Sequence, residues 1–269
     1  MKHNPGNIEN TKIYKEIISR KRACYFISPH LDDAIFSSAN LLIELVRNSV
    51  PVNIINVFSE ADSKPYTASA WKFLLQCGYY SADKLFADRR DEDRKVINKL
   101  GAQVENLGFT DALWRRLKYG GMRGVLGQYI GELTHVYPTY KFGIARGIVS
   151  SLDHKIYPQL QRKLLERIQE GSIVFCPIAI GRHVDHLIVR DVCKSTFRDN
   201  IVYWSDYPYE TQNSQETEFI ESNHLRAYTY MKYSPLKNEL INGYLSQMKV
   251  IFGGVADHSN VTETYYIQK

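Results

Sequence analysis

The chain has 269 residues, 44% hydrophobic and 23% charged, a composition typical of a globular protein that buries a full core. Its formal net charge of +5 comes without a dense block of Lys and Arg beyond residues 20–22, which argues against nucleic-acid binding. No segment approaches the roughly 20 apolar residues of a membrane span, and the polar N-terminus lacks the apolar core of a secretion signal. We therefore expect a soluble, cytoplasmic protein with no membrane span.

The four cysteines point to the same compartment. They show no CxxC spacing, and Cys24 and Cys176 lie inside apolar, strand-like runs. This pattern is typical of buried, reduced thiols rather than of disulfide partners or a zinc knuckle.

Strands and helices alternate along the predicted chain. Strands are predicted at 23–27, 52–58, 104–107, 172–176, 201–204 and 263–268, with an edge strand within 225–233. Helices are predicted at 12–20, 34–47, 82–100, 155–170, from the loop 181–186 to about 197, and at 235–251. Residues 1–11 are expected to form a flexible arm. The alternation predicts a Rossmann-like three-layer α/β/α fold with a mostly parallel sheet, formed by one domain that spans residues 1–269.

Three stretches of this domain lack clear periodicity, namely 59–82, 109–150 and 205–224. Long irregular segments in compact domains tend to be functional. We expect these three stretches to be loops that select the substrate.

Two clusters of His and Asp lie where predicted strands end. One follows the first strand and the other follows the strand at 172–176, and their members are His30, Asp32 and Asp33, and His183, Asp185 and His186. In a doubly wound sheet these strands are neighbours where the strand order reverses, so both clusters would face one crevice. His and carboxylate ligands without thiolate suit a catalytic zinc ion with an open position for water.

The spacing alone also fits a structural interpretation. Adjacent Asp residues at a helix start are good N-caps, and Asp185 is placed to cap the helix that follows it. The turn at 28–33 lacks the glycines that a pyrophosphate requires, which excludes a dinucleotide site. A metal site and a set of helix caps both remain open at this point.

Pro29-His30-Leu31-Asp32-Asp33 and His183-Val184-Asp185-His186 together resemble the paired signature of the PIG-L/LmbE-like zinc-dependent deacetylases. This family removes N-acetyl groups from glucosamine-type substrates, including glycolipid precursors, thiol-sugar conjugates and antibiotic intermediates. Weaker resemblances to the family lie at 89–101, 107–111, 205–209 and 244–247. The resemblance implies an LmbE-like fold and a hydrolase that releases acetate from an N-acetylglucosamine-type sugar or sugar conjugate.

Carried over residue by residue, the resemblance implies a metal site and a base. His30, Asp33 and His186 match the metal ligands of the family. They imply one Zn²⁺ per chain, with another divalent ion such as Fe²⁺ as an alternative. Asp32 matches the general base, which takes a proton from the water that attacks the acetamide carbonyl.

The resemblance implies roles for four further residues. His183 matches the residue that stabilises the tetrahedral intermediate, and Asp185 matches its orienting partner. Arg89 and Asp111 match positions that contact the sugar. These assignments complete a predicted site of eight side chains.

The chain departs from the family pattern at three places. Ala34 replaces the usual Glu after the Asp pair, and residues 37–40 replace a Gly pair, so we expect altered packing of the first helix on the sheet. Gly181 lies where some members place a catalytic Tyr. Any phenol role must therefore come from elsewhere, with Tyr207 and Tyr209 as the candidates.

Two other functions remain open. One is an amidase that acts on a thiol-sugar or another amide conjugate, and the other is a non-catalytic Rossmann-like binding protein. For the enzyme the expected partner is a small N-acetylated amino sugar or glycoconjugate, with no nucleic acid. The sequence leaves the oligomeric state open.

Overall fold

The structure is a computed structural model that describes residues 5–211 and 216–268. Within these ranges one sheet has the strand order β1-β7-β8-β6-β5-β2-β3-β4. The strands are β1 (Gly6–Asn7), β2 (Cys24–Ser28), β3 (Val52–Asn56), β4 (Gln103–Asn106), β5 (Ile173–Pro177), β6 (Ile201–Trp204), β7 (Leu225–Tyr230) and β8 (Glu263–Gln268). Only β8 runs antiparallel to its neighbours among the described pairs, so the predicted mostly parallel sheet is confirmed.

Strands β2 and β5 are neighbours at the centre of this sheet, with Phe26 paired in register with Phe175. Strands β3 and β4 follow β2 towards one edge of the sheet, and β6 follows β5 towards the other edge. The predicted reversal of strand order therefore lies between the two strands that precede the His and Asp clusters.

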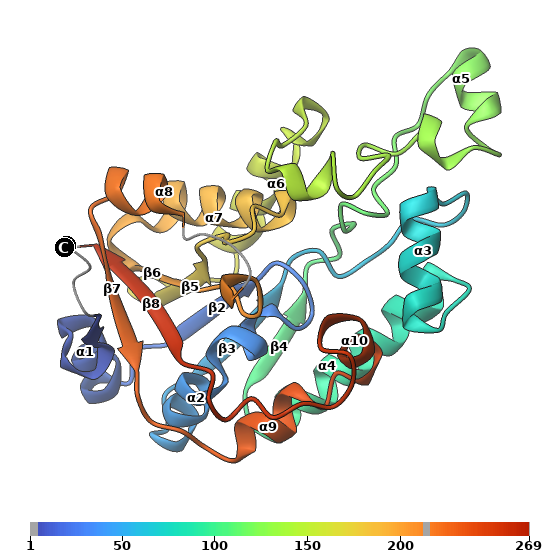
Figure 1. Cartoon of the computed structure of the whole chain (residues 1–269). Helices are drawn as coiled ribbons and strands as arrows, with labels where there is room; N and C mark the ends of the chain where they lie inside the picture. The colour runs from blue at the N-terminus through green and yellow to red at the C-terminus, as the bar shows by residue number, and fades with distance from the viewer. Residues whose placement is uncertain (1–4, 212–215, 269) are drawn as a thin grey trace.

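Helices cover both faces of the sheet (Figure 1). Their bounds are α1 (Lys12–Arg20), α2 (Asp33–Arg47), α3 (Ala68–Cys77), α4 (Ala82–Leu100), α5 (Gly121–Leu126), α6 (Ile156–Leu165), α7 (Val184–Phe197), α8 (Thr217–Ser222), α9 (Leu236–Ile241) and α10 (Leu245–Ile251). Side chains alternate across β2, so Phe26 joins the core beneath α1, α2 and α9, while Ile27 joins the core beneath α6 and α7. The result is the predicted three-layer α/β/α arrangement.

The first long helix is kinked where the chain departs from the family pattern. Ser38 has φ −139° and ψ 16°, which is not helical. The backbone N–H groups of Asn40 and Leu41 donate to the buried carboxylate of Glu263 at 2.7 and 3.0 Å. The buried ammonium of Lys237 pairs with the same carboxylate at 3.1 Å. A charged pair from α9 and β8 thus satisfies the backbone groups that the kink leaves free.

Five sequence predictions are wrong in detail. Residues 59–82 are not wholly irregular, because α3 begins after Thr67, whose hydroxyl accepts from the N–H of Ala70, and ends at Gly78 with φ 82°. Residues 205–224 are not wholly a loop either, because they contain α8. The predicted helix at 235–251 is two helices, since α9 ends before Gly243, where a Cβ would lie 2.6 Å from a Val96 methyl carbon.

The other two errors concern the sheet edge. Residues 6–10 of the predicted flexible arm form β1 and a short 3₁₀ helix, and Ile8 is 2% exposed in the core. Strand β7 is therefore not an edge strand, because β1 pairs with it. Residues 1–4 of the arm lie outside the described part of the chain.

The structure also bears on the predicted cysteines and on the predicted lack of a membrane span. All four cysteines are free, and Cys24, Cys176 and Cys193 are buried. None of the described helices is long and apolar enough to cross a membrane.

Candidate active site

The carboxyl ends of β2 and β5 bring the two His and Asp clusters together. His30 lies in the turn between β2 and α2, and His183 and His186 lie at the start of α7. The ring of His30 is 5.0 Å from that of His183 and 5.2 Å from that of His186, measured between centroids. The structure thus places side chains separated by about 150 residues in one site, as the strand order requires.

Among the three predicted metal ligands, the carboxylate of Asp33 lies beside the rings of both His30 and His186. Asp33 Oδ2 lies 3.1 Å from His30 Nδ1 and 3.3 Å from His186 Nε2. Burial alone would raise the pKa of Asp33, but the two imidazoles outweigh it and hold the pKa well below its usual range. His186 Nε2 is buried and makes no hydrogen bond within residues 5–211 and 216–268. A buried ring nitrogen that makes no hydrogen bond, set beside a carboxylate and a second imidazole, fits a divalent metal ion such as Zn²⁺.

Two sets of three residues each bring their candidate donor atoms within 4.8 Å of one another. The first set is His30, His183 and His186, and the second is His30, Asp111 and Asp185. The first set contains two of the three predicted ligands. His30 belongs to both sets and therefore stands at the centre of the cluster.

Asp206 holds His186 in place and was not given a role from the sequence. Its Oδ1 lies 2.7 Å from His186 Nδ1, and its Oδ2 accepts from the N–H of Ile180 at 2.8 Å. Burial lowers the pKa of His186, but the carboxylates of Asp33 and Asp206 outweigh it and raise the pKa to about 9. In zinc sites a carboxylate commonly bonds the ring nitrogen of a His ligand that faces away from the metal. A search of the sequence for such a carboxylate could have suggested a role for Asp206.

Asp32, the predicted base, pairs with Arg89 and not with a histidine of the cluster. The residue is 5% exposed, and its carboxylate lies 3.4 Å from Arg89 Nη2. Burial raises the pKa of Asp32, an effect that Arg89 opposes and the adjacent Asp33 reinforces. Asp32 belongs to neither set of candidate metal donors among the described residues. Arg89, predicted to contact the sugar, is thus also the ion-pair partner of the base.

Asp185 contacts His183 through its backbone. Its N–H donates to His183 Nδ1 at 3.3 Å. Its fully buried carboxylate accepts from the N–H of Ala112 at 2.9 Å and lies 3.3 Å from His30 Nε2. Burial and the facing His30 hold the pKa of His183 well below its usual range. Through its N–H and its carboxylate, Asp185 thus contacts one histidine of each cluster.

Arg115 is a buried part of the site that sequence reasoning missed. Its guanidinium bonds Asp185 and Asp153, each at 2.5 Å, and Tyr137 donates to Asp153 at 2.9 Å. Burial would raise the pKa of Asp185, but Arg115 outweighs it and lowers the pKa. No local sequence signal marks Arg115, because its partners are 38 and 70 residues away.

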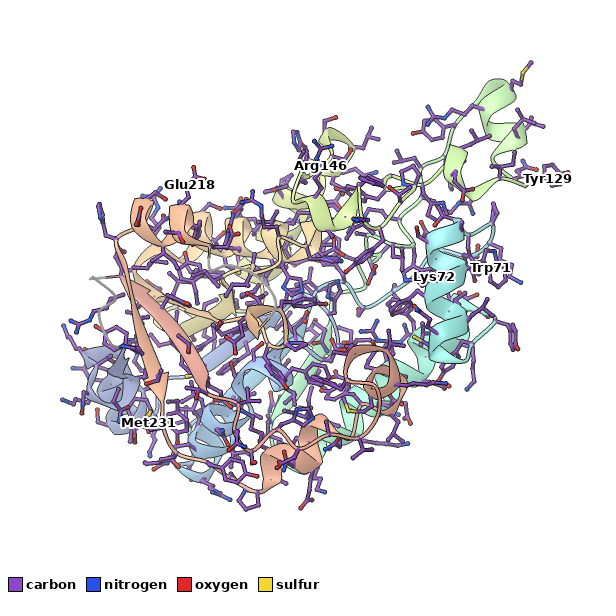
Figure 2. The ribbon with its side chains drawn as sticks, in the orientation of Figure 1. Trp71, Lys72, Tyr129, Arg146, Glu218 and Met231 are labelled. Carbon is purple, nitrogen blue, oxygen red and sulfur yellow. The ribbon has the colours of Figure 1, made fainter. Side chains whose placement is uncertain are left out.

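A cavity of about 550 Å³ opens over the cluster. Its polar floor consists of His30, Asp32, Asp33, Arg89, Asp111 and His183, and Phe36, Leu113 and Trp114 add apolar surface beside them. Its wall comes from α3, α10 and two loops, and consists of Ser69, Lys72, Phe73, Gln76, Tyr140, Lys141, Tyr207, Pro208, Tyr209, Gln247, Val250 and Ile251. Figure 2 shows Lys72 and Trp71 on different sides of α3, and the ring of Trp71 packs edge-to-face against that of Tyr66. Each of the three stretches expected to be irregular contributes to the wall, and α10 adds a part that was not expected.

Three tyrosines of the wall lie near the histidines. The ring of Tyr209 is 6.0 Å from that of His186, and the ring of Tyr140 is 6.2 Å from that of His183. Tyr207 instead places its hydroxyl 3.1 Å from His258 Nδ1. Tyr209 therefore lies nearer to the cluster than Tyr207, and Tyr140 is a candidate that the sequence did not suggest.

The strand order and the site together define a class, an α/β protein whose polar site lies where a doubly wound sheet reverses its strand order. Within this class the chain belongs to the PIG-L family, because its residues 25–197 match the family described as GlcNAc-PI de-N-acetylase. The resemblance found in the two His and Asp motifs is confirmed.

Individual relatives agree with this assignment. The chain is 26% identical to a 2'-N-acetylparomamine deacetylase of Niallia circulans over 253 residues, 88% of this chain and 85% of that protein. It is similar to the structure of a deacetylase–teicoplanin complex, with TM-score 0.68, 22% identity, and 92% and 99% of the two chains covered. A zinc-inhibited form of teicoplanin deacetylase gives TM-score 0.67 at 21% identity, with 91% and 97% covered. At such identities the structural likeness shows the fold, and the LmbE-like fold is confirmed.

Proposed function

We propose that this chain is a metal-dependent hydrolase that removes the N-acetyl group from an amino sugar or an amino-sugar conjugate. The observation that carries the proposal is the cavity of about 550 Å³, whose floor joins two imidazoles to three carboxylates. A concave site with a few convergent polar groups of perturbed pKa is where a small-molecule reaction is expected. The relative named 2'-N-acetylparomamine deacetylase supports an N-acetylated amino sugar as the substrate class.

The donor atoms support a metal at one end of this floor. His30, Asp33 and His186 would hold a divalent ion, with Zn²⁺ as the first choice for two imidazoles and a carboxylate. Such an ion, when bound, polarises a carbonyl oxygen and lowers the pKa of a water molecule. Asp206 fixes the ring of His186, so the ligand needs no reorientation to bind.

The proton chemistry is assigned to Asp32. Its carboxylate lines the cavity, and Arg89 holds it in position from the side. We infer that Asp32 takes a proton from the attacking water and passes it to the departing amine, so that acetate and a free amine leave. His183, on the opposite motif, stabilises the negative charge that develops on the acetamide oxygen.

Arg89 and Asp111 are the residues assigned to the sugar. Both line the cavity beside the cluster, and both are less than 10% exposed. A guanidinium and a carboxylate offer a donor and an acceptor for neighbouring sugar hydroxyls. They would hold the ring so that its acetamido group faces Asp32 and His183.

Release of acetate from a panel of N-acetylated amino sugars tests this function. The purified protein is stripped of metal with a chelator and then supplied with Zn²⁺ or Fe²⁺, each from less than one to several equivalents. The zinc-inhibited form known for a relative is the reason for the titration. We expect acetate release that disappears on stripping and returns with one equivalent of ion. Acetate release that chelation leaves unchanged would remove the metal from the proposal, and no release from any member would remove the activity.

A further inference from the structure

Positive charge and exposed apolar side chains are concentrated in one segment of the chain. Residues 116–152 hold five Lys or Arg and one Glu, so these 37 residues carry four of the five units of formal net charge. They also hold nine of the sixteen large apolar side chains that are exposed in the described chain. The nine are Met122, Val125, Leu126, Tyr129, Ile130, Tyr140, Phe142, Ile148 and Leu152. Exposed apolar surface gathered in this way marks an interaction site.

Part of this segment projects from the body of the molecule (Figure 1). Residues 116–135, the projecting loop, have α5 at the tip and a bridge between Arg116 and His135 at the base. The guanidinium of Arg116 also donates to the backbone carbonyls of Ser63 and Lys64, at 3.1 and 2.8 Å. Hydrogen bonds at the base therefore hold the tip clear of the sheet.

The tip presents an apolar face to the outside. The helical spacing i, i+3, i+4 and i+7, which defines one side of a helix, is filled by Met122, Val125, Leu126 and Tyr129. The helical turn continues past α5, because the N–H of Ile130 donates to the carbonyl of Leu126 at 3.0 Å. None of the residues of α5 is buried, and Figure 2 shows Tyr129 at the outer margin of the molecule. A surface helix usually turns its apolar face to the core, whereas this one turns it outward.

The active-site cavity does not account for this face. Trp114 and Tyr140, which lie before and after the projecting loop in the sequence, line the cavity. No residue from 115 to 139 is among the lining residues of the described chain. A substrate in the cavity would therefore leave the tip exposed, and the apolar face needs a partner outside the active site.

We propose that the tip of the projecting loop is a docking surface for an anionic membrane, in which the apolar face of α5 enters the headgroup region. Lys118 and Arg123 are exposed beside this face, and residues 116–131 contain no Asp or Glu. A helix with an apolar face and basic neighbours is typical of segments that lie in the membrane interface. Each Lys or Arg near an anionic lipid surface strengthens binding by about 5-fold. The proposal is independent of the reaction proposed above.

A membrane fits the tip better than a second copy of the chain does. In a symmetric dimer the two tips would face each other with the same positive charges, which repel. A stable protein interface also needs about 800 Å² from each partner, supplied by roughly 20–30 residues. A helix of six residues that projects from the body offers much less. In a bilayer, by contrast, each inserted side chain is buried without a matching protein surface.

Vesicle binding by the full chain tests the proposal. The vesicles consist of phosphatidylcholine alone, or of phosphatidylcholine and phosphatidylglycerol in a ratio of about 7:3, which gives an anionic surface. Partition is measured by co-sedimentation as the salt concentration is raised. We expect binding to the anionic vesicles to be about 20-fold tighter than to the neutral ones. The difference should shrink as salt rises, because the Debye length falls from about 10 Å at 0.1 M to about 3 Å at 1 M.

Two double variants separate attraction by charge from insertion. Lys118→Gln/Arg123→Gln should weaken binding to anionic vesicles about 25-fold, because two basic residues are lost. Val125→Ser/Leu126→Ser should weaken it by about 10-fold or more, because apolar surface that enters the bilayer is lost. Tyr129→Trp reports insertion directly, and brominated lipid should quench its fluorescence beyond the quenching seen for the parent protein.

The controls change the same kinds of side chain elsewhere on the surface. Arg94→Gln/Lys95→Gln removes two exposed basic residues of α4. Leu245→Ser/Val255→Ser removes two apolar residues that are 68% and 77% exposed. Both control variants should bind anionic vesicles as the parent protein does.

Three results would overturn the proposal. They are the absence of vesicle binding, equal binding to neutral and anionic vesicles, and binding that either double variant of the tip retains in full. Sedimentation velocity without lipid examines the alternative partner. A dimer that Val125→Ser/Leu126→Ser dissociates, together with no vesicle binding, would assign the tip to a second copy of the chain instead.

Discussion

The floor and the wall of the cavity are built in different ways. On the floor, the acidic residues and Arg89 are each less than 10% exposed, and they pair with one another or with His30. On the wall, the charged side chains are exposed and without ion-pair partners in the described chain. Fixed, desolvated charges are what catalysis requires, because they need no reorganisation during the reaction. Exposed, unpaired charges are suited to choosing among substrates. The comparison predicts that changes on the floor affect stability and turnover strongly, whereas changes on the wall affect binding alone.

The largest effect is expected from Arg115→Met. It leaves the fully buried carboxylate of Asp185 without its cation, and breaking one side of a buried pair typically costs about 3–5 kcal/mol of unfolding free energy. The matched control is Arg167→Met, whose partner Glu105 is exposed, and there the loss should be at most about 1 kcal/mol. Urea denaturation measures both. Equal losses in the two variants would contradict the description of the charges beneath the floor as a buried network.

A pH effect of similar size is expected from the buried Asp93, which links β3 to the residue before α10. Its carboxylate accepts from Asn56 of β3 at 2.7 Å and from Tyr244, just before α10, at 2.8 Å. Burial raises the pKa of Asp93 from 3.8 to about 7, although both hydrogen bonds oppose this. A raised pKa in the folded state means that stability is greatest below about pH 4 and declines as the pH rises through about 7. The decline attributable to Asp93 is at most roughly 4 kcal/mol, at about 1.4 kcal/mol per pKa unit.

Denaturation curves between pH 4 and pH 8 measure this decline. Asp93→Asn should be less dependent on pH than the parent protein, because the titrating group is gone. A difference between the two proteins that stays constant across this range would show that Asp93 does not titrate there.

The site could be predicted from the sequence where local signals coincide with strand ends. The apolar runs of β2 and β5 each stop at a polar motif, so the position of the two clusters followed from the fold class alone. Arg115 carried no such signal, because its role depends on the distant Asp153 and Asp185. The wall was the least predictable part. The residues of α3 lack a clear apolar period, and only the capping residue Thr67 and the terminal Gly78 mark the helix.

A smaller effect, beneath the floor, is expected from Asp206→Asn. The variant keeps the shape of the side chain but replaces the carboxylate that bonds His186 Nδ1. Loss of such a partner typically weakens metal affinity or activity by about 10- to 100-fold. Competition with a fluorescent zinc chelator measures the affinity. Asp83→Asn, on the exposed first turn of α4, is the control, and an unchanged affinity for Asp206→Asn would mean that Asp206 has only a structural part.

The smallest effect is expected on the wall. Gln76 of α3 lines the cavity and is exposed. Gln76→Ala should raise KM by a few-fold at most and leave kcat unchanged, since a contact made equally with substrate and transition state affects KM alone. Steady-state kinetics of acetate release separate the two constants. A fall in kcat as large as that of a floor variant would remove the distinction between floor and wall.

The central claim is that the floor holds a metal ion and a separate base, and comparison of the unmodified protein with Asp32→Asn tests it most directly. Bound divalent metal is determined by mass spectrometry on the same samples used for acetate release from an N-acetylated amino sugar. We predict the same metal content in both proteins and a loss of about 10²- to 10⁴-fold in turnover in the variant, because general-base catalysis contributes that much. A variant that retains near-normal turnover, or that loses its metal together with its activity, would contradict the separation of the base Asp32 from the ligands His30, Asp33 and His186.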